Sequence, residues 1–249
     1  MWIGPEPATI ETKGDKINAR NLMAEAGMPV ADGTPDPVMD ADSAAAQAER
    51  IGYPVMLKAA AGTAARAIGY RGAGTIECLV DTERQDFVFL EMNTRLQVEH
   101  PVTELVWDID LVAEQLRVAA GERPGFDPDT VRPAGHALEL RIYAEDPRTF
   151  LPGPGKLTTW RPPTGDGIRV DSGYDEGDTV TQYYDPLMAK LCVWGTDRPD
   201  ALDRARKALE RFDVEGPKCN LPFFTELLQT HQYDDGTYDT ETVNRIRGG

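Results

Sequence analysis

The chain has 249 residues, 41% of them hydrophobic and 27% charged, which is typical of one large or two small globular domains and excludes a disordered chain. Asp and Glu outnumber Lys and Arg by 42 to 26, and the net charge of −16 opposes binding to nucleic acid or to an anionic membrane. The three scattered cysteines, Cys78, Cys192 and Cys219, argue against a disulfide framework or a thiolate zinc site and suit a reducing cytoplasm.

The first third of the chain predicts two helices and a strand. A helix capped by Asp15 is expected to end at Gly27, because glycine is the preferred residue after a helix. A second, Ala-rich helix is expected to start at Asp40 or Asp42 and to end at Gly52. The short apolar run 53–59 has the length and composition of a strand.

From Gly74 onward, the hydrophobic residues recur with a period of two. This alternation predicts strands over 75–80 and 87–92. The polar stretch 81–86 between them has the length of a hairpin turn, so the two strands are expected to pair antiparallel.

The remainder of the chain predicts further helices and many short strands. One helix is expected over 110–119, ended by Gly121, and another over 200–212. The run 137–143 alternates as a strand does, and Pro and Gly recur in the turns around it. This order of elements predicts an α+β fold with a mainly antiparallel sheet and flanking helices.

The segment after the second hairpin strand carries an unusual series of polar side chains. In an extended chain alternate residues share a face, and the odd positions from 91 onward are Glu91, Asn93, Arg95, Gln97 and Glu99. The alternative is an ordinary solvated face. Such faces usually carry Thr, Lys and Ser, so the ordered set of carboxylates, amides and a guanidinium favours a binding site.

The hairpin arithmetic places two carboxylates together. A turn centred on Arg84 pairs Glu77 with Glu91 across the two strands. Like charges at such positions repel, so the arrangement favours a divalent cation between them, and two carboxylates with the amide of Asn93 suit Mg²⁺. A register shift of one or two residues, which would separate the pair, is the alternative.

Three basic residues outside this segment are candidate anion contacts. Lys16 lies at a predicted helix start beside Gly14, and Lys58 ends an apolar strand, although lysines at such positions are commonly just solvated. Arg141 shares a strand face with Glu139. A structural ion pair explains these two residues as well as an anion site does.

Long motifs now make a family recognisable. The segments GAGTIECLV and FVFLEMNTRLQVEHPVTE strongly resemble those of the biotin carboxylases, the ATP-grasp enzymes of acyl-CoA and pyruvate carboxylases. The segments WIGPEP, KGDK, IGYPVMLKAAAG, HALELRIYAEDP, FLPGPGK and YYDPLMAKL resemble the same family, in the same order. The resemblance extends over nearly the whole chain.

The resemblance implies a two-step reaction with ATP, Mg²⁺ or Mn²⁺, and biotin on a carrier protein. Bicarbonate and MgATP give carboxyphosphate, and its carbon dioxide passes to N1 of biotin. The implied partners are a biotin carboxyl carrier protein or domain, a second copy of the chain and a carboxyltransferase subunit, in the cytoplasm, with no nucleic acid and no membrane.

The resemblance also implies a role for each matching residue. Glu77, Glu91 and Asn93 correspond to magnesium ligands, and Lys16 and Lys58 to nucleotide phosphate contacts. Glu99 resembles the general base that deprotonates bicarbonate. Arg95, Gln97 and the backbone of Val98 resemble the bicarbonate pocket, in which a planar guanidinium holds a planar anion. Arg141 resembles the residue that stabilises the biotin enolate.

The sequence also departs from the family pattern. The family has an N-terminal subdomain before WIGP, and a glycine-rich loop and ATP lid after KAAAG; here Gly62 runs directly into Thr63. We therefore expect residues 1–62 to be linker helices and a stub of the lid domain, and 63–249 to be the C-terminal catalytic domain. Either the intact protein has these parts, or the chain is truly this short and has little or no activity.

Two other functions remain as alternatives. The first is a non-catalytic module that serves dimerisation or assembly of a carboxylase complex, which would show no bicarbonate-dependent ATP hydrolysis. The second is another ATP-grasp ligase with a different acceptor, whose turnover would be insensitive to free biotin.

Overall fold

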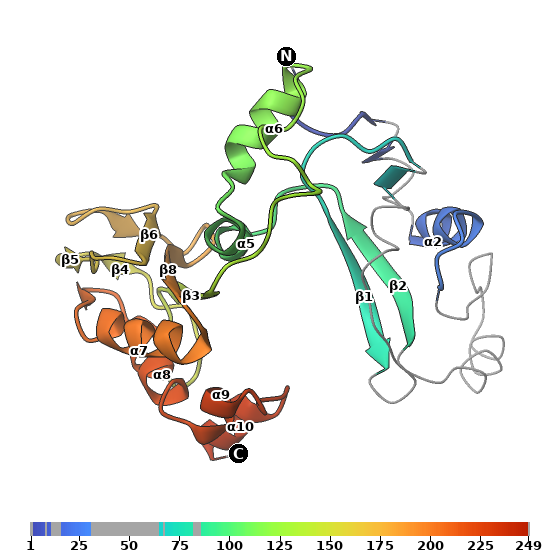
Figure 1. The fold of residues 1–249 in the computed structure, drawn as a ribbon. Coiled ribbons are helices and arrows are strands. Elements are labelled where there is room, and N and C mark those ends of the chain that lie inside the picture. Colours follow the sequence, from blue (N-terminus) through green and yellow to red (C-terminus); the bar gives the residue numbers. More distant parts are fainter. Residues whose placement is uncertain are drawn as a thin grey trace. The chain divides into compact units, whose positions relative to one another are not determined.

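The computed structural model describes residues 2–7, 9–10, 16–30, 65–66, 68–81 and 86–248. The chain divides into two compact units, each described here by itself (Figure 1). Unit 1 comprises Met1–His100 and Asp110–Asp127, and unit 2 comprises Pro101–Ile109 and Pro128–Gly249. The predicted helix over 40–52 and strand over 53–59 lie outside the described residues.

Unit 1 is built on a hairpin of two long strands, β1 (Thr75–Asp81) and β2 (Asp86–Asn93), which pair antiparallel (Figure 1). The predicted hairpin is therefore confirmed. Helix α2 (Lys16–Glu25) packs against β2. The buried cluster between them consists of Met23, Met28, Phe89 and Met92.

Three helix ends in unit 1 follow the capping signals, whereas the predicted cap Asp15 lies outside the described residues. Gly27, after α2, has a φ of +80°, the left-handed conformation in which glycine ends helices. Helix α6 (Leu111–Ala119) begins where the Asp110 carboxylate accepts a hydrogen bond of 2.8 Å from the backbone N–H of Ala113. Gly121, with a φ of +85°, follows its end, so this predicted helix is confirmed.

Unit 2 is centred on a three-stranded antiparallel sheet in the order β3–β8–β6. The strands are β3 (His136–Tyr143), β8 (Leu187–Gly195) and β6 (Ile168–Ser172). One face of the sheet is apolar and packs against helix α7 (Arg198–Leu209). Its core includes Leu138, Leu140, Ile142, Leu191, Val193, Ala201, Leu202 and Ala205.

Two short strand pairs complete unit 2. Strand β4 (Gly155–Lys156) pairs with β7 (Thr179–Val180), and β5 (Thr159–Arg161) pairs with β9 (Asp213–Glu215), both antiparallel. Within the second pair Trp160 is buried edge-on against Phe212, with ring centroids 5.2 Å apart. Both rings belong to the core beneath α7, so this pair closes one side of the core.

The helices of unit 2 were only partly predicted. Helix α7 was expected over 200–212, but it begins at Arg198 because the Asp197 carboxylate accepts from the backbone N–H of Asp200 at 2.9 Å. It ends at Leu209, before Phe212. The helices missed by the sequence analysis are α5 (His100–Trp107), α8 (Leu221–Leu227), α9 (His231–Asp235) and α10 (Thr242–Arg247).

The described elements confirm the α+β class, because helices α2 and α7 pack on sheets whose strands all pair antiparallel. Within the described part of the chain, no helix has the length and apolar character needed to cross a bilayer.

Candidate functional site

The hairpin of unit 1 brings the two expected carboxylates together. Glu77 on β1 is the register partner of Glu91 on β2, as the turn arithmetic predicted, and a bulge follows between Glu77 and Cys78. Both residues are partly buried. Residues directly opposite in an antiparallel ladder have Cβ atoms about 4.5–5.5 Å apart, so the pair needs a positively polarised group near it.

Asn93 supplies that group in the structure. Its Nδ2 donates a hydrogen bond of 2.5 Å to Oε1 of Glu77 and a longer one of 3.5 Å to Oε1 of Glu91. The amide therefore links the two carboxylates. The assignment of amide O and N follows the hydrogen-bond network, and a rotated Asn93 would present its oxygen to a cation instead.

The polar series continues beyond the strand, but not in the extended form that was expected. Strand β2 ends at Asn93, and Arg95 and Gln97 lie in a loop, so the prediction of one continuous strand face up to residue 99 is wrong. The side chains nevertheless form a connected chain. Arg95 Nη1 donates to Gln97 Oε1 at 3.1 Å, and Gln97 Nε2 donates to Glu77 Oε1 at 3.5 Å.

Glu99 and Val98 occupy the turn that leads into α5, and both are exposed. Two contacts between Gln97 and His100 fix this turn. The Gln97 carbonyl oxygen lies 2.8 Å from Nδ1 of His100 and accepts a hydrogen bond of 3.3 Å from the His100 backbone N–H. Glu99 is therefore held at the surface, one residue before the helix begins.

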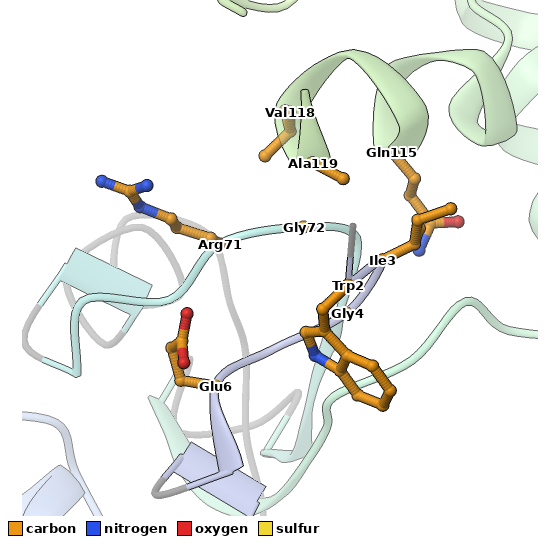
Figure 2. Close-up of a pocket in the computed structure, with 9 residues that line it drawn as sticks. All are labelled: Trp2, Ile3, Gly4, Glu6, Arg71, Gly72, Gln115, Val118 and Ala119. Atoms are coloured by element: carbon orange, nitrogen blue, oxygen red, sulfur yellow. The ribbon is translucent and has the colours of Figure 1, made fainter. Parts of the chain in front are cut away.

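A hollow in unit 1 borders Arg95. It has a volume of about 270 Å³, and its lining includes Trp2, Tyr70, Thr94, Arg95 and Leu96. An adjoining hollow of about 250 Å³ shares Trp2 and Gln115 (Figure 2). Figure 2 shows its wall, formed by the N-terminal segment, the loop at Arg71 and Gly72, and residues of α6. Either space is larger than a bicarbonate ion requires.

Arg141 belongs to unit 2, on strand β3, where it lies opposite Lys190 of β8. Its Nε lies 3.3 Å from Oε1 of Glu139, so the ion pair that was one of the two interpretations is present. Asn220 holds the backbone on either side of the bulge in β3. Its Nδ2 donates to the Arg141 carbonyl and its Oδ1 accepts from the Tyr143 N–H, both at 3.0 Å.

The two candidate phosphate contacts are not tested by the structure. Lys58 lies outside the described residues, and for Lys16 only its backbone is described, as the first residue of α2.

The side chains of the hairpin that could bind a metal ion fit a hard divalent cation, although there are only three of them among the described residues. Among the described residues, no group of three or more His, Cys, Asp or Glu side chains could hold a metal ion. The hairpin offers three potential oxygen ligands, the carboxylates of Glu77 and Glu91 and the amide of Asn93. In the structure the Asn93 Nδ2 lies between the two carboxylates, in the position that a cation would take. A magnesium ion keeps several waters and binds substrate phosphates, so two carboxylates and an amide suffice for it.

Sequence analysis missed Asn220. An Asn before Leu-Pro resembles an ordinary helix N-cap, and Asn220 does precede α8. Its side chain, however, makes no capping hydrogen bond and instead binds β3, which lies almost 80 residues earlier in the chain. No local signal in the sequence distinguishes the two uses.

Comparison with known families assigns both parts of the chain. Residues 139–245 match the family described as "Biotin carboxylase C-terminal domain". Residues 15–64 and 60–124 match, as two stretches, the family described as "Carbamoyl-phosphate synthase L chain, ATP binding domain". The two stretches meet at residues 60–64, where the sequence departs from the order of motifs expected for the family.

Curated relatives give the same assignment. "Biotin carboxylase 2" of Bacillus subtilis is 34% identical, over 98% of this chain and 77% of the relative. A pyruvate carboxylase subunit of Methanothermobacter thermautotrophicus is 33% identical, over 99% of this chain and 70% of the relative. The first alignment runs over 343 positions against 249 residues, so the relative has residues without a counterpart here.

Solved structures agree in fold. A biotin carboxylase complex with ATP from Campylobacter jejuni has a TM-score of 0.90 at 28% identity, covering 98% of this chain and 76% of that one. The biotin carboxylase domain dimer of Hydrogenobacter thermophilus 2-oxoglutarate carboxylase, solved with MgADP, ADP and bicarbonate, has a TM-score of 0.90 at 28% identity, covering 98% and 75%. The chain belongs to the biotin carboxylase family.

Proposed function

We propose that the chain is the biotin carboxylase component of an acyl-CoA or pyruvate carboxylase, acting with ATP, bicarbonate and biotin on a carrier protein. The observation that carries the proposal is the pairing of Glu77 with Glu91, joined through Asn93 and continued by Gln97 and Arg95. This set combines a divalent cation site with a guanidinium for a planar anion.

Each residue then has a role that its surroundings support. Glu77, Glu91 and Asn93 would hold Mg²⁺, which when bound neutralises charge on the ATP phosphates. Arg95, which lines the hollow, binds bicarbonate together with Gln97 and the backbone of Val98. Glu99, exposed in its turn, removes the proton from bicarbonate.

The remaining roles extend this proposal. Arg141 stabilises the enolate of biotin as its N1 attacks, because a guanidinium favours a developing oxyanion. Lys16 and Lys58 contact nucleotide phosphates. The partners are a biotin carboxyl carrier protein or domain, a second copy of the chain and a carboxyltransferase subunit, in the cytoplasm. We propose that residues 63–249 form the catalytic domain and that residues 1–62 form linker helices and a stub of the lid domain. Where no lid excludes water, we expect little turnover.

The test of the proposed function is bicarbonate-dependent ATP hydrolysis. We expect the chain to hydrolyse MgATP faster when bicarbonate is present, and Glu99→Gln to lower this rate by about 100-fold or more, because a general base typically contributes that much. Glu122→Gln, at an exposed carboxylate of the same unit, is the matched control and should leave the rate unchanged. Absence of any turnover at high MgATP would favour the assembly module instead.

Metal binding tests the hairpin without requiring turnover. Substoichiometric Mn²⁺ is expected to broaden the NMR signals of the Asn93 side-chain amide. Glu77→Gln or Glu91→Gln should raise the Mn²⁺ concentration needed by about tenfold or more, since each removes one of two anionic ligands. Glu122→Gln again serves as the control. Equal broadening in all variants would exclude a cation site at this hairpin.

A further inference from the structure

The face of the sheet in unit 2 that points away from α7 is charged. Strand alternation places Leu138, Leu140 and Ile142 on the core side and Glu139 and Arg141 on the other. The ladder sets Cys192 opposite Glu139 and Lys190 opposite Arg141. Strand β6 adds a third column to this face, made of Arg169 opposite Cys192 and Asp171 opposite Lys190.

The bases on this face pair with its two carboxylates, Asp171 and Glu139, and Arg169 also pairs with Glu104 of α5 at 2.6 Å. Asp171 forms ion pairs with two of the three basic residues, Arg169 at 2.7 Å and Lys190 at 3.4 Å; the third is Arg141. Arg141 lies against Glu139 instead, at 3.3 Å. Arg141 and Lys190 are like charges in directly opposing positions, an arrangement that destabilises a ladder unless each lies beside its own carboxylate.

Glu139 is the more deeply placed partner of its pair. Its side chain is 4% exposed, whereas that of Arg141 is 36% exposed. A carboxylate removed from water must be compensated by charge and hydrogen bonds, so Glu139 holds its cation firmly. The guanidinium thus lies between a buried carboxylate on one side and solvent on the other.

The second oxygen of Glu139 faces a thiol that stays protonated. Sγ of Cys192 lies 3.9 Å from Oε2 of Glu139 and is fully buried. Burial, and after it the charge of Glu139, raises the pKa of this thiol to about 12. At neutral pH Cys192 therefore carries the proton that it can donate to the carboxylate.

We infer that Glu139 is a positioning residue for Arg141, which it orients through Nε while Asn220 fixes the backbone at the same residue. The carboxylate oxygen that accepts from Nε fixes the direction of that N–H bond, and the buried amide of Asn220 fixes the strand from which the side chain projects. This inference rests on the proposed function, because it matters for catalysis only if Arg141 faces the biotin enolate. Its effect would be preorganisation of a charge before the substrate arrives.

The direct test is the hydrogen exchange of the Arg141 Nε–H, followed by ¹⁵N NMR and assigned by the loss of its signal in Arg141→Lys. In the unmodified chain we expect exchange at least about tenfold slower than at Arg161, whose side chain is 71% exposed. Glu139→Gln, which keeps an acceptor, should show an intermediate rate, and Glu139→Met should lose the protection. Asp203→Asn, at an exposed carboxylate of α7 in the same unit, is the matched control and should preserve it.

A fast Nε–H in the unmodified chain would overturn the inference without any variant, as would unchanged protection in a folded Glu139→Met. Activity gives a separate readout. Glu139→Gln should lower biotin-dependent turnover by about tenfold, leave bicarbonate-dependent ATP hydrolysis without biotin unchanged, and have no further effect when combined with Arg141→Lys. Slow exchange of the Arg141 Nε–H in a chain without turnover would support the positioning role of Glu139 and contradict only the proposed function.

Discussion

Gly216→Ala is expected to lower the free energy of unfolding of unit 2 by more than about 4 kcal/mol, which is among the largest effects of a single substitution. Gly216 follows β9 with a φ of +115°, and a Cβ there would lie 1.9 Å from the carbonyl oxygen of Lys156 and 3.2 Å from the backbone nitrogen of Thr158. These are backbone atoms, so they cannot turn away as a side chain would. The chain after β9 would have to move away from Lys156 and Thr158, which lie directly before β5, and this would disturb the pair β5–β9 that holds Trp160 in the core.

Gly177→Ala is the control for this effect. Gly177 also has a positive φ, +101°, but its Cβ would meet no heavy atom within 4 Å. It should lose only the strain of the backbone conformation, about 1–3 kcal/mol. Denaturant unfolding of both variants measures the difference, and equal losses would show that the contact with Lys156 does not matter.

Glu104→Ala is expected to lower the free energy of unfolding by about 3 kcal/mol. Glu104 lies on α5 with 7% of its side chain exposed, and its Oε2 lies 2.6 Å from Nη1 of Arg169 on β6. The substitution leaves Arg169 without its buried partner, although Asp171 compensates part of the charge and the Arg169 side chain is 37% exposed to water. Denaturant unfolding followed by fluorescence measures the loss.

An exposed pair provides the comparison. Arg161 and Asp213 lie 3.1 Å apart, but their side chains are 71% and 51% exposed. Asp213→Ala should therefore cost less than about 1 kcal/mol, because water solvates both charges without the pair. If the two alanine variants lost the same stability, the burial of Glu104 would not be the cause.

The hairpin was predictable because its signals are local. Period-two alternation identified β1 and β2, and the short turn fixed their register closely enough to place Glu77 opposite Glu91. The same reasoning failed after Asn93, because nothing in the alternation of residues 93–99 shows that the strand has ended. It also missed α5, whose eight residues include a proline at the second position.

The contacts of Arg141 were only half predictable. Glu139 is two residues away on the same strand, so a contact was foreseeable, but its 4% exposure arises in a sheet where β8 lies beside it and Cys192 faces it. The hydrogen bonds of Asn220 to β3 and of Arg169 to Glu104 join residues more than 60 positions apart. Such contacts follow from how the elements pack, and a single sequence carries no local trace of them.

The path of the chain decides how this protein can be dissected. Unit 2 takes α5 from a segment that interrupts unit 1, so the chain passes between the units three times, after His100, Ile109 and Asp127. No single cut yields two whole units. A recombinant fragment starting at Pro128 would lose Glu104 and leave Arg169 without that partner, so expression of the C-terminal part alone requires α5 to be grafted back.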